Sequence, residues 1–185
     1  SLTHLENRRY FQQRLEIDWV DHQDSSRTRA LIILGLDGFT QLNDTHGTKI
    51  ADDTLLILSE RFQELSQREH CHLSRLGGDT FGFWIPAIKN EQQLECFIRN
   101  ISQHVNKPLK HSRGVSIKVS GSMGVFTYPD KGLDAKNPIR CAEVAMNWAK
   151  KQNKGAVAYY SSAWMKEIQA RREQEEELIR AFDEK

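Results

Sequence analysis

The segment Arg75-Leu76-Gly77-Gly78-Asp79-Thr80-Phe81 contains the residues of this chain whose types and spacing are best suited to chemistry. Apolar residues precede and follow it, so the two glycines are expected at the turn of a β-hairpin. Glycine tolerates positive φ and lets a ligand approach the backbone closely. Asp79 would then stand at the turn and point toward whatever the hairpin holds. The segment therefore predicts a ligand-binding hairpin with one carboxylate at its tip.

Composition limits the kinds of protein that could carry this hairpin. The chain has 185 residues, of which 38% are hydrophobic, and this suits one domain with a sizeable core. Its net charge of +1 gives no general reason to expect a nucleic acid or an anionic membrane as partner. No apolar run approaches the roughly 20 residues that span a bilayer. Three widely spaced cysteines (Cys71, Cys96 and Cys141) fit neither a disulfide framework nor a zinc ribbon, which favours the cytoplasm.

Alternating strand and helix patterns surround the hairpin and must position it. Ala51, Leu55, Leu58, Phe62 and Leu65 recur at spacings of four and three, which predicts one apolar helical face. A short apolar run at 30–34 predicts a buried strand. The other expected elements are a helix at 5–19 capped by Thr3, a helix at 91–105, a strand region at 115–128, a helix at 141–151 and a strand at 156–160.

The last segment, 161–185, differs because a charged block at 171–177 separates two apolar groups. We interpret 1–160 as one domain and 161–185 as a linker helix toward a missing downstream domain. A terminal helix with a solvated face is the alternative. The chain begins at Ser1 without a methionine and ends inside a helical pattern. We therefore expect a piece of a longer protein.

Six motifs in order resemble those of the GGDEF family. The hairpin resembles RxGGDEF, with Thr80 where that family has glutamate. The others are 2–9 (like LTGLPNRR), 36–44 (like LDxFKxxND), 45–52 (like TxGHxxGD), 122–125 (like SxGV) and 145–150 (like ALYxAK). The resemblance implies an α/β (α+β) fold like that of nucleotidyl cyclases and polymerase palms. Its central antiparallel sheet is flanked by helices and followed here by the C-terminal linker helix.

Active members of the family condense two GTP into cyclic di-GMP, with Mg²⁺ or Mn²⁺ held by carboxylates in a homodimer. The resemblance places the metal at Asp79, at the Leu36 backbone and at a strand-end aspartate, which is Gly35 here. Thr80 replaces the catalytic glutamate, and a threonine hydroxyl is no useful base near neutral pH. Asp37 could share the metal with Asp79, but we interpret it as a structural residue. We therefore expect no turnover, and Mg²⁺ only together with bound GTP.

The residues that would hold the nucleotide are better preserved. The resemblance assigns guanine recognition to Asn43 and Asp52 and phosphate binding to Lys150 and Lys154, beside Gly77 and Gly78 of the hairpin. Turn and cap chemistry is the alternative for the first pair. A solvated helix end is the alternative for the lysines. The family's product-inhibition pair is reduced to Arg68, because Cys71 stands in place of its aspartate.

The sequence thus predicts a regulatory, catalytically degenerate GGDEF domain of a cyclic di-GMP signalling protein. It would bind GTP and modulate a downstream EAL phosphodiesterase, because 172–185 resembles the connector between such domains. An active diguanylate cyclase and a ligand-free dimerisation scaffold are the alternatives. No nucleic acid and no direct membrane contact are expected for this fragment, although the full-length protein could be membrane-anchored.

Overall fold

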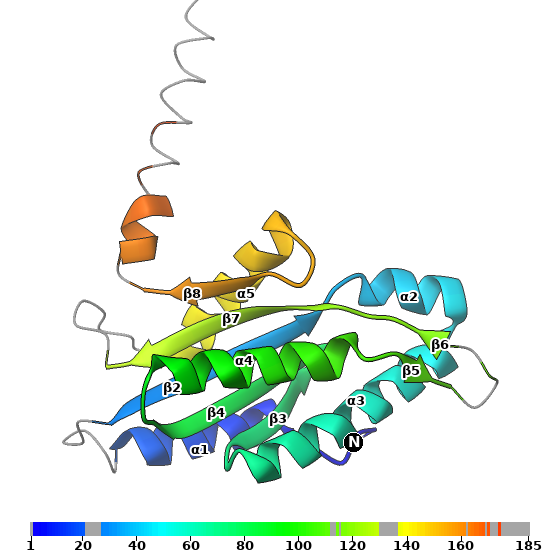
Figure 1. Ribbon diagram of the computed structural model, residues 1–185, viewed down its shortest axis with the longest axis horizontal. Coiled ribbons are helices and arrows are strands. Elements are labelled where there is room, and N and C mark those ends of the chain that lie inside the picture. The colour runs from blue at the N-terminus through cyan, green and yellow to red at the C-terminus, as the bar shows by residue number, and fades with distance from the viewer. Residues whose placement is uncertain are drawn as a thin grey trace, which may run out of the picture.

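The computed structural model describes residues 2–20, 27–111, 114, 116–129, 137–161, 163–168, 170 and 174. Its centre is a six-stranded sheet in the order β1-β3-β4-β2-β7-β8 (Figure 1). These strands are β1 (Glu6–Asn7), β2 (Thr28–Leu36), β3 (His72–Gly77), β4 (Thr80–Ile88), β7 (Gly121–Tyr128) and β8 (Val157–Tyr160). The four central strands are antiparallel to one another, whereas β1 and β8 pair parallel with β3 and β7 at the two edges. This is the mixed α/β fold with a mainly antiparallel sheet that the sequence predicted.

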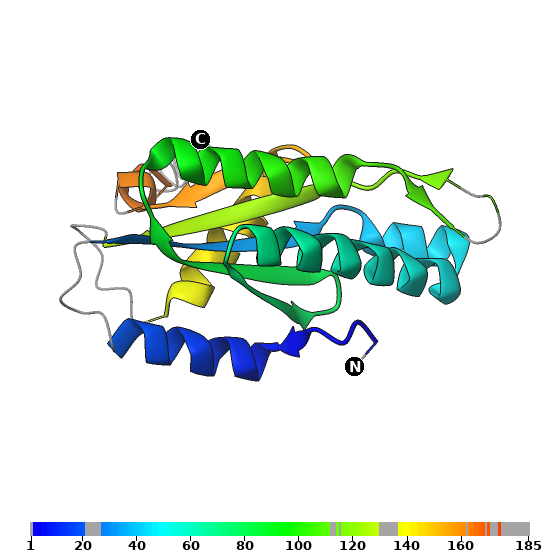
Figure 2. The same ribbon diagram turned by 60° about the horizontal axis from the view of Figure 1, so that its bottom comes forward.

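Helices cover both faces of the sheet. They are α1 (Arg8–Val20), α2 (Phe39–His46), α3 (Thr48–Arg68), α4 (Glu91–Asn106) and α5 (Pro138–Gln152). One core lies under α3 and α4, whereas α1 and α5 pack on the opposite face (Figure 2). A separate two-stranded ladder joins β5 (Leu109–Lys110) to β6 (Ser116–Ile117). Among the residues that the structure describes, none of the helices combines the length and apolarity that crossing a bilayer requires.

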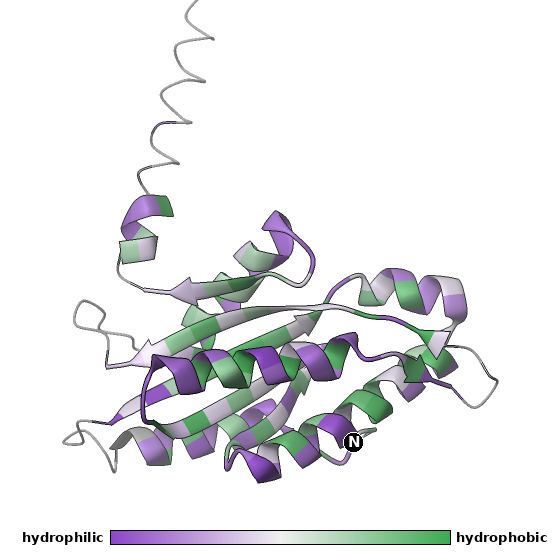
Figure 3. Ribbon diagram, in the orientation of Figure 1, coloured by the Kyte–Doolittle hydropathy of each residue, from purple (hydrophilic) through white to green (hydrophobic). Residues whose placement is uncertain are grey.

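β2 is the central strand, and both of its faces are buried. Ile32 and Leu34 face the α3–α4 core, and Leu31 and Ile33 face the α1–α5 core, because successive side chains alternate across a sheet. In Figure 3 the central strands accordingly contain many hydrophobic residues, whereas α3 and α4 also carry hydrophilic ones. A strand buried on both faces reads as a continuous apolar run, which explains why 30–34 was recognisable in the sequence.

α5 lies directly on the backbone of β7 at Gly124. A Cβ atom at Gly124 would stand 1.9 Å from the Ala142 carbonyl oxygen and 2.3 Å from the Met146 nitrogen. No side chain therefore separates the helix from the strand at this point. The contact fixes the height of α5 above the sheet and thereby the position of the residues at its C-terminal end.

Three expected boundaries are wrong. α1 begins at Arg8, because the Asn7 side chain accepts a hydrogen bond from the Tyr10 nitrogen at 3.0 Å, while Thr3 is buried. Two helices, α2 and α3, follow β2, with Gly47 at φ 83° between them. The strand region at 115–128 divides into β6 and β7, which belong to different sheets.

The chain after β8 starts with a short helical segment at 163–168. Trp164 at its start packs edge-on against Trp148 of α5, with ring centroids 5.7 Å apart, and lies 5.7 Å from the Tyr160 ring. This aromatic cluster ties the segment to α5. Most of the linker helix predicted at 161–185, including nearly all of 172–185, lies outside the described residues, so that interpretation remains a prediction.

Candidate functional site

The candidate site forms where the end of β2 meets the β3–β4 turn and the last turn of α5. The Leu36 nitrogen donates a hydrogen bond to the Asp79 carbonyl oxygen at 3.2 Å, which joins the strand end to the hairpin. Gly35 and Thr80 are direct partners in the β2–β4 register. Gly35 and Thr80, two positions at which the sequence lacks an acidic residue of the motifs, therefore lie side by side on adjacent strands.

The hairpin turn has the geometry that its glycines predicted. Gly77 and Gly78 have φ values of 141° and 50°, a region that favours glycine. The Arg75 guanidinium donates two hydrogen bonds to the Gly78 carbonyl oxygen, at 2.9 Å from Nε and 2.6 Å from Nη2. Arg75 thus stabilises the turn, a role that was not predicted although the arginine belongs to the motif itself. The turn holds Asp79 half-buried at the edge of the site.

Lys150 reaches into the site from α5. Its Nζ donates a hydrogen bond to the Leu36 carbonyl oxygen at 2.9 Å and lies 3.4 Å from Asp79 Oδ2. The same side chain covers Gly35, where an added Cβ would stand 2.7 Å from both Lys150 Cε and Nζ. The ammonium therefore contacts the two groups that the sequence assigned to the metal, Leu36 and Asp79.

The remaining oxygen of Asp79 is also engaged. Thr80 Oγ1 donates to Asp79 Oδ1 at 3.3 Å. A pair of divalent cations normally needs several carboxylate oxygens, and this position offers one carboxylate and one carbonyl, both in contact with an ammonium. Within the described ranges, no three His, Cys, Asp or Glu side chains come together as a metal site. The residues present do not fit the metal that the family uses.

Asp37 has a structural role, as the sequence interpretation held. Its carboxylate accepts hydrogen bonds from Ser122 Oγ at 2.7 Å, from Ser120 Oγ at 2.7 Å and from the Gly155 nitrogen at 2.8 Å. These partners belong to the start of β7 and to the loop before β8. Asp37 thus joins three segments around the site, and its oxygens are occupied by donors from the chain itself.

Asn43 and Asp52 lie on consecutive helices, α2 and α3, that Gly47 separates. Both residues are partly buried, and neither side chain has a hydrogen-bonding partner among the described residues. Their amide and carboxylate groups are therefore available to an external donor or acceptor. Turn or cap bonding, the alternative to guanine recognition, is not what these side chains do in the structure.

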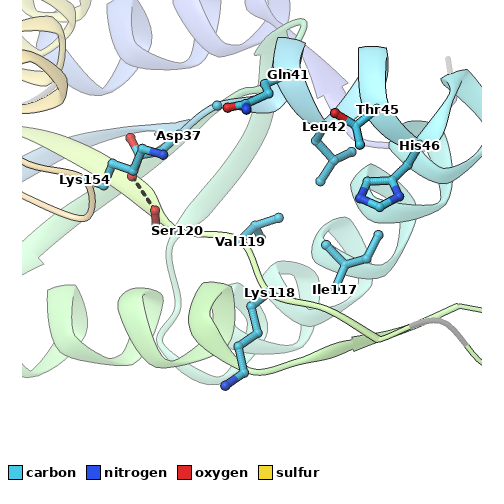
Figure 4. A pocket seen from close by; sticks show the side chains of 11 residues that line it. Asp37, Gln41, Leu42, Thr45, His46, Ile117, Lys118, Val119, Ser120 and Lys154 are labelled. Carbon is cyan, nitrogen blue, oxygen red and sulfur yellow. Dashed lines mark hydrogen bonds between the residues drawn. The ribbon is translucent and has the colours of Figure 1, made fainter.

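A pocket of about 530 Å³ lies between α2 and residues 117–120. Figure 4 shows that α2 supplies one wall and that residues 117–120 supply the opposite wall, with Lys154 beside Asp37 at one end. Lys154 is exposed and lines the pocket together with Asp37. Neither Asn43 nor Asp52 lines this pocket. Of the two lysines that the resemblance assigned to phosphate, Lys154 lines this pocket, whereas Lys150 contacts Leu36 and Asp79.

Arg68 lies away from these residues, at the C-terminal end of α3. It is exposed, and its Nε stands 3.5 Å from the Glu69 carboxylate. Burial, with the nearby Glu69 carboxylate as a smaller cause, raises the pKa of the Cys71 thiol to about 12. A neutral, partly buried thiol carries no charge that could replace that of an aspartate.

Comparison with known proteins decides the family. The model of the family described as "Diguanylate cyclase, GGDEF domain" matches residues 1–156. The chain belongs to the GGDEF family. The bifunctional diguanylate cyclase/cyclic di-GMP phosphodiesterase MucR of Pseudomonas aeruginosa is 28% identical over 163 residues, which are 88% of this chain and 23% of MucR. The diguanylate cyclase TpbB of the same organism is 28% identical over 84% of this chain and 36% of its own length. The chain therefore spans about a quarter to a third of the length of these relatives.

Solved structures agree with this assignment. The GGDEF domain of TpbB from Pseudomonas aeruginosa superposes with a TM-score of 0.83 at 26% identity, covering 91% of this chain and 98% of that domain. The GGDEF domain of DgcB from Caulobacter crescentus has a TM-score of 0.76 at 20% identity and shows the fold alone. This GGDEF domain thus has the architecture of the GGDEF domain of TpbB.

Proposed function

We propose that this GGDEF domain is a regulatory, catalytically degenerate member of a cyclic di-GMP signalling protein. The observation that carries the proposal is the pairing of Gly35 with Thr80 across β2 and β4. Both positions belong to acidic residues in the family motifs, and both have lost their charge. Stabilisation of a phosphoryl-transfer reaction by metal-borne charge is normally a large part of catalysis, so its loss at adjacent positions removes turnover.

An active cyclase would need Asp37 to replace the missing metal ligand. The Asp37 carboxylate accepts three hydrogen bonds from the chain, so this use of Asp37 would break the contacts that join β2, β7 and the loop before β8. We therefore favour a domain that binds GTP or a related guanine nucleotide without converting it. Support for the binding comes from Asn43 and Asp52, whose side chains are unpartnered within the described part of the chain.

The proposed readout is a downstream EAL phosphodiesterase domain. Relatives include MucR, named as a bifunctional cyclase and phosphodiesterase, and NbdA, named as a cyclic di-GMP phosphodiesterase, and the chain covers 23% of each. Within this chain, α5 carries both Lys150 at the site and Trp148, which packs on Trp164 at the start of the exit segment. A nucleotide that shifts α5 would thereby reach the segment that leads out of the domain.

Calorimetric titration with GTP, followed by chromatography of the recovered nucleotide, tests the proposal. We expect saturable binding and unchanged GTP. Cyclic di-GMP above a no-protein control would refute the loss of catalysis. Absence of binding in every buffer would refute the nucleotide-binding role and favour the scaffold.

A further inference from the structure

We propose that the Lys150 ammonium is the resident cation of this site, so that the site takes the phosphates of a guanine nucleotide without a divalent metal ion. The nucleotide part of this proposal rests on the proposed function. The cation part stands on the geometry of this chain alone, and the two can fail separately.

The first step is the convergence of two oxygens on one point. The Leu36 carbonyl oxygen lies 2.9 Å from Lys150 Nζ, and Asp79 Oδ2 lies 3.4 Å from the same atom. A carbonyl and a carboxylate that point at a common position form part of a cation site, because both present lone pairs to it. The cation at that position is a side chain of the protein.

The second step is the space above Gly35. An added Cβ at Gly35 would meet Lys150 Cε and Nζ at 2.7 Å and Met146 Sδ at 2.8 Å, well inside ordinary contact distance. A side chain at position 35 and the observed placement of Lys150 therefore exclude one another. The Lys150 ammonium can occupy this position because residue 35 has no side chain.

The third step is charge. A glutamate at position 80 and an aspartate at position 35 would join Asp79 in a cluster of like charges, which demands an added cation. In this chain Thr80 donates a hydrogen bond to Asp79 at 3.3 Å, and Lys150 pairs with its other oxygen. One carboxylate and one ammonium leave no net charge to attract a divalent ion. A metal that entered would have to displace the ammonium and then remain beside it.

The fourth step is what the ammonium can still bind. A lysine ammonium has three donors, and the two oxygens of this site use two of them. The third donor has no partner among the described residues, and because part of the Lys150 side chain is exposed, an anionic group can reach it from solvent. A phosphate oxygen suits this donor, since it is a strong acceptor with negative charge. The same side chain then replaces the metal and contacts the nucleotide.

A titration with Mn²⁺ alone, in which electron paramagnetic resonance measures the free ion, tests whether Lys150 occupies the cation site. We expect no saturable Mn²⁺ binding by the wild-type domain. The double variant Gly35→Asp/Lys150→Ala removes the ammonium and adds a carboxylate, so it should bind Mn²⁺ saturably under conditions in which the wild type does not. Lys151→Ala removes an exposed neighbouring lysine and should behave as wild type. Wild-type binding as tight as that of the double variant would overturn the proposal.

Titration with GTP tests the nucleotide part, once in Mg²⁺ and once in EDTA. We expect the wild-type dissociation constant to change by less than about threefold between the two buffers. Lys150→Ala should weaken binding in EDTA by about tenfold or more, whereas Lys151→Ala should not. Loss of wild-type binding in EDTA would overturn the metal-free mode. Absence of GTP binding in both buffers would refute the proposed function, while the Mn²⁺ result would still judge the role of Lys150. Thermal unfolding of each variant confirms that it is folded.

Discussion

Replacement of Asp37 by alanine should destabilise the domain strongly, because it removes the acceptor of three hydrogen bonds. A hydrogen bond to a charged group contributes about 1.5–3 kcal/mol. Ser120 and Gly155 can turn to water after the change, but Ser122 is fully buried and its hydroxyl would lose its partner. We therefore expect a loss of about 3–5 kcal/mol in the free energy of unfolding. For a domain of this size, that corresponds to a fall of about 10–15 °C in Tm.

Asp37→Asn should cost much less, about 1–2 kcal/mol. The amide oxygen can accept from Ser120 and Gly155, while the amide nitrogen donates to the Ser122 hydroxyl, which has free lone pairs. Urea and thermal denaturation measure both variants, with Asp44→Ala at an exposed position of α2 as the matched control. A loss below about 1 kcal/mol in Asp37→Ala, together with a loss of Mn²⁺ binding, would refute the structural role and assign the carboxylate to a metal.

Three further outcomes follow from the packing and the titrating groups. Gly124→Ala should cost about 3 kcal/mol or more in unfolding free energy, because its Cβ meets the α5 backbone at 1.9 Å. Gly82→Ala meets side-chain atoms alone, the Phe11 ring at 2.8 Å and Leu76 Cδ1 at 3.1 Å, and should cost less in the same denaturation assay. Iodoacetamide should label exposed Cys96 at pH 8 and leave Cys71 unreacted until unfolding, as peptide mass spectrometry can show, because burial raises the pKa of Cys71 to about 12. Burial and a nearby guanidinium lower the pKa of His72, so the unfolded state takes up the proton first and Tm should fall as the pH drops below about 6.5; His72→Gln should reduce that fall in a thermal scan across pH, and an unchanged slope would contradict this assignment.

Elements whose signals are local were predictable from the sequence. The apolar spacing from Ala51 to Leu65 gave α3, and the continuous apolar run gave the centre of β2. The start of α1 was not predictable, because Glu6 and Asn7 pair with β3, far along the chain. A strand of two residues is too short to show the alternation of apolar and polar residues by which a strand is predicted.

The same contrast holds within the site. The hairpin and Asp79 were recognisable, because consecutive residues are enough to predict a tight turn. The contact between Lys150 and Leu36 joins positions 114 apart, and Asp37 meets its serines 83 and 85 positions away. Such pairings depend on how the strands align in space, and the residue types alone leave several partners open. The motif therefore pointed to the hairpin, while the contacts of Lys150 with Leu36 and Asp79 are visible only in the fold.

The contact of Gly124 with α5 also limits how the domain can move. Because the helix backbone rests on the strand backbone between Ala142 and Met146, α5 cannot move closer to the sheet at this point. Lys150 lies four residues beyond Met146, about 6 Å along the helix axis. A tilt of about 10° would move that end by only about 1 Å, yet Trp148 and its aromatic partners turn with it. A tilt of α5 about Gly124 would therefore move the Lys150 ammonium and the contact between Trp148 and Trp164 together.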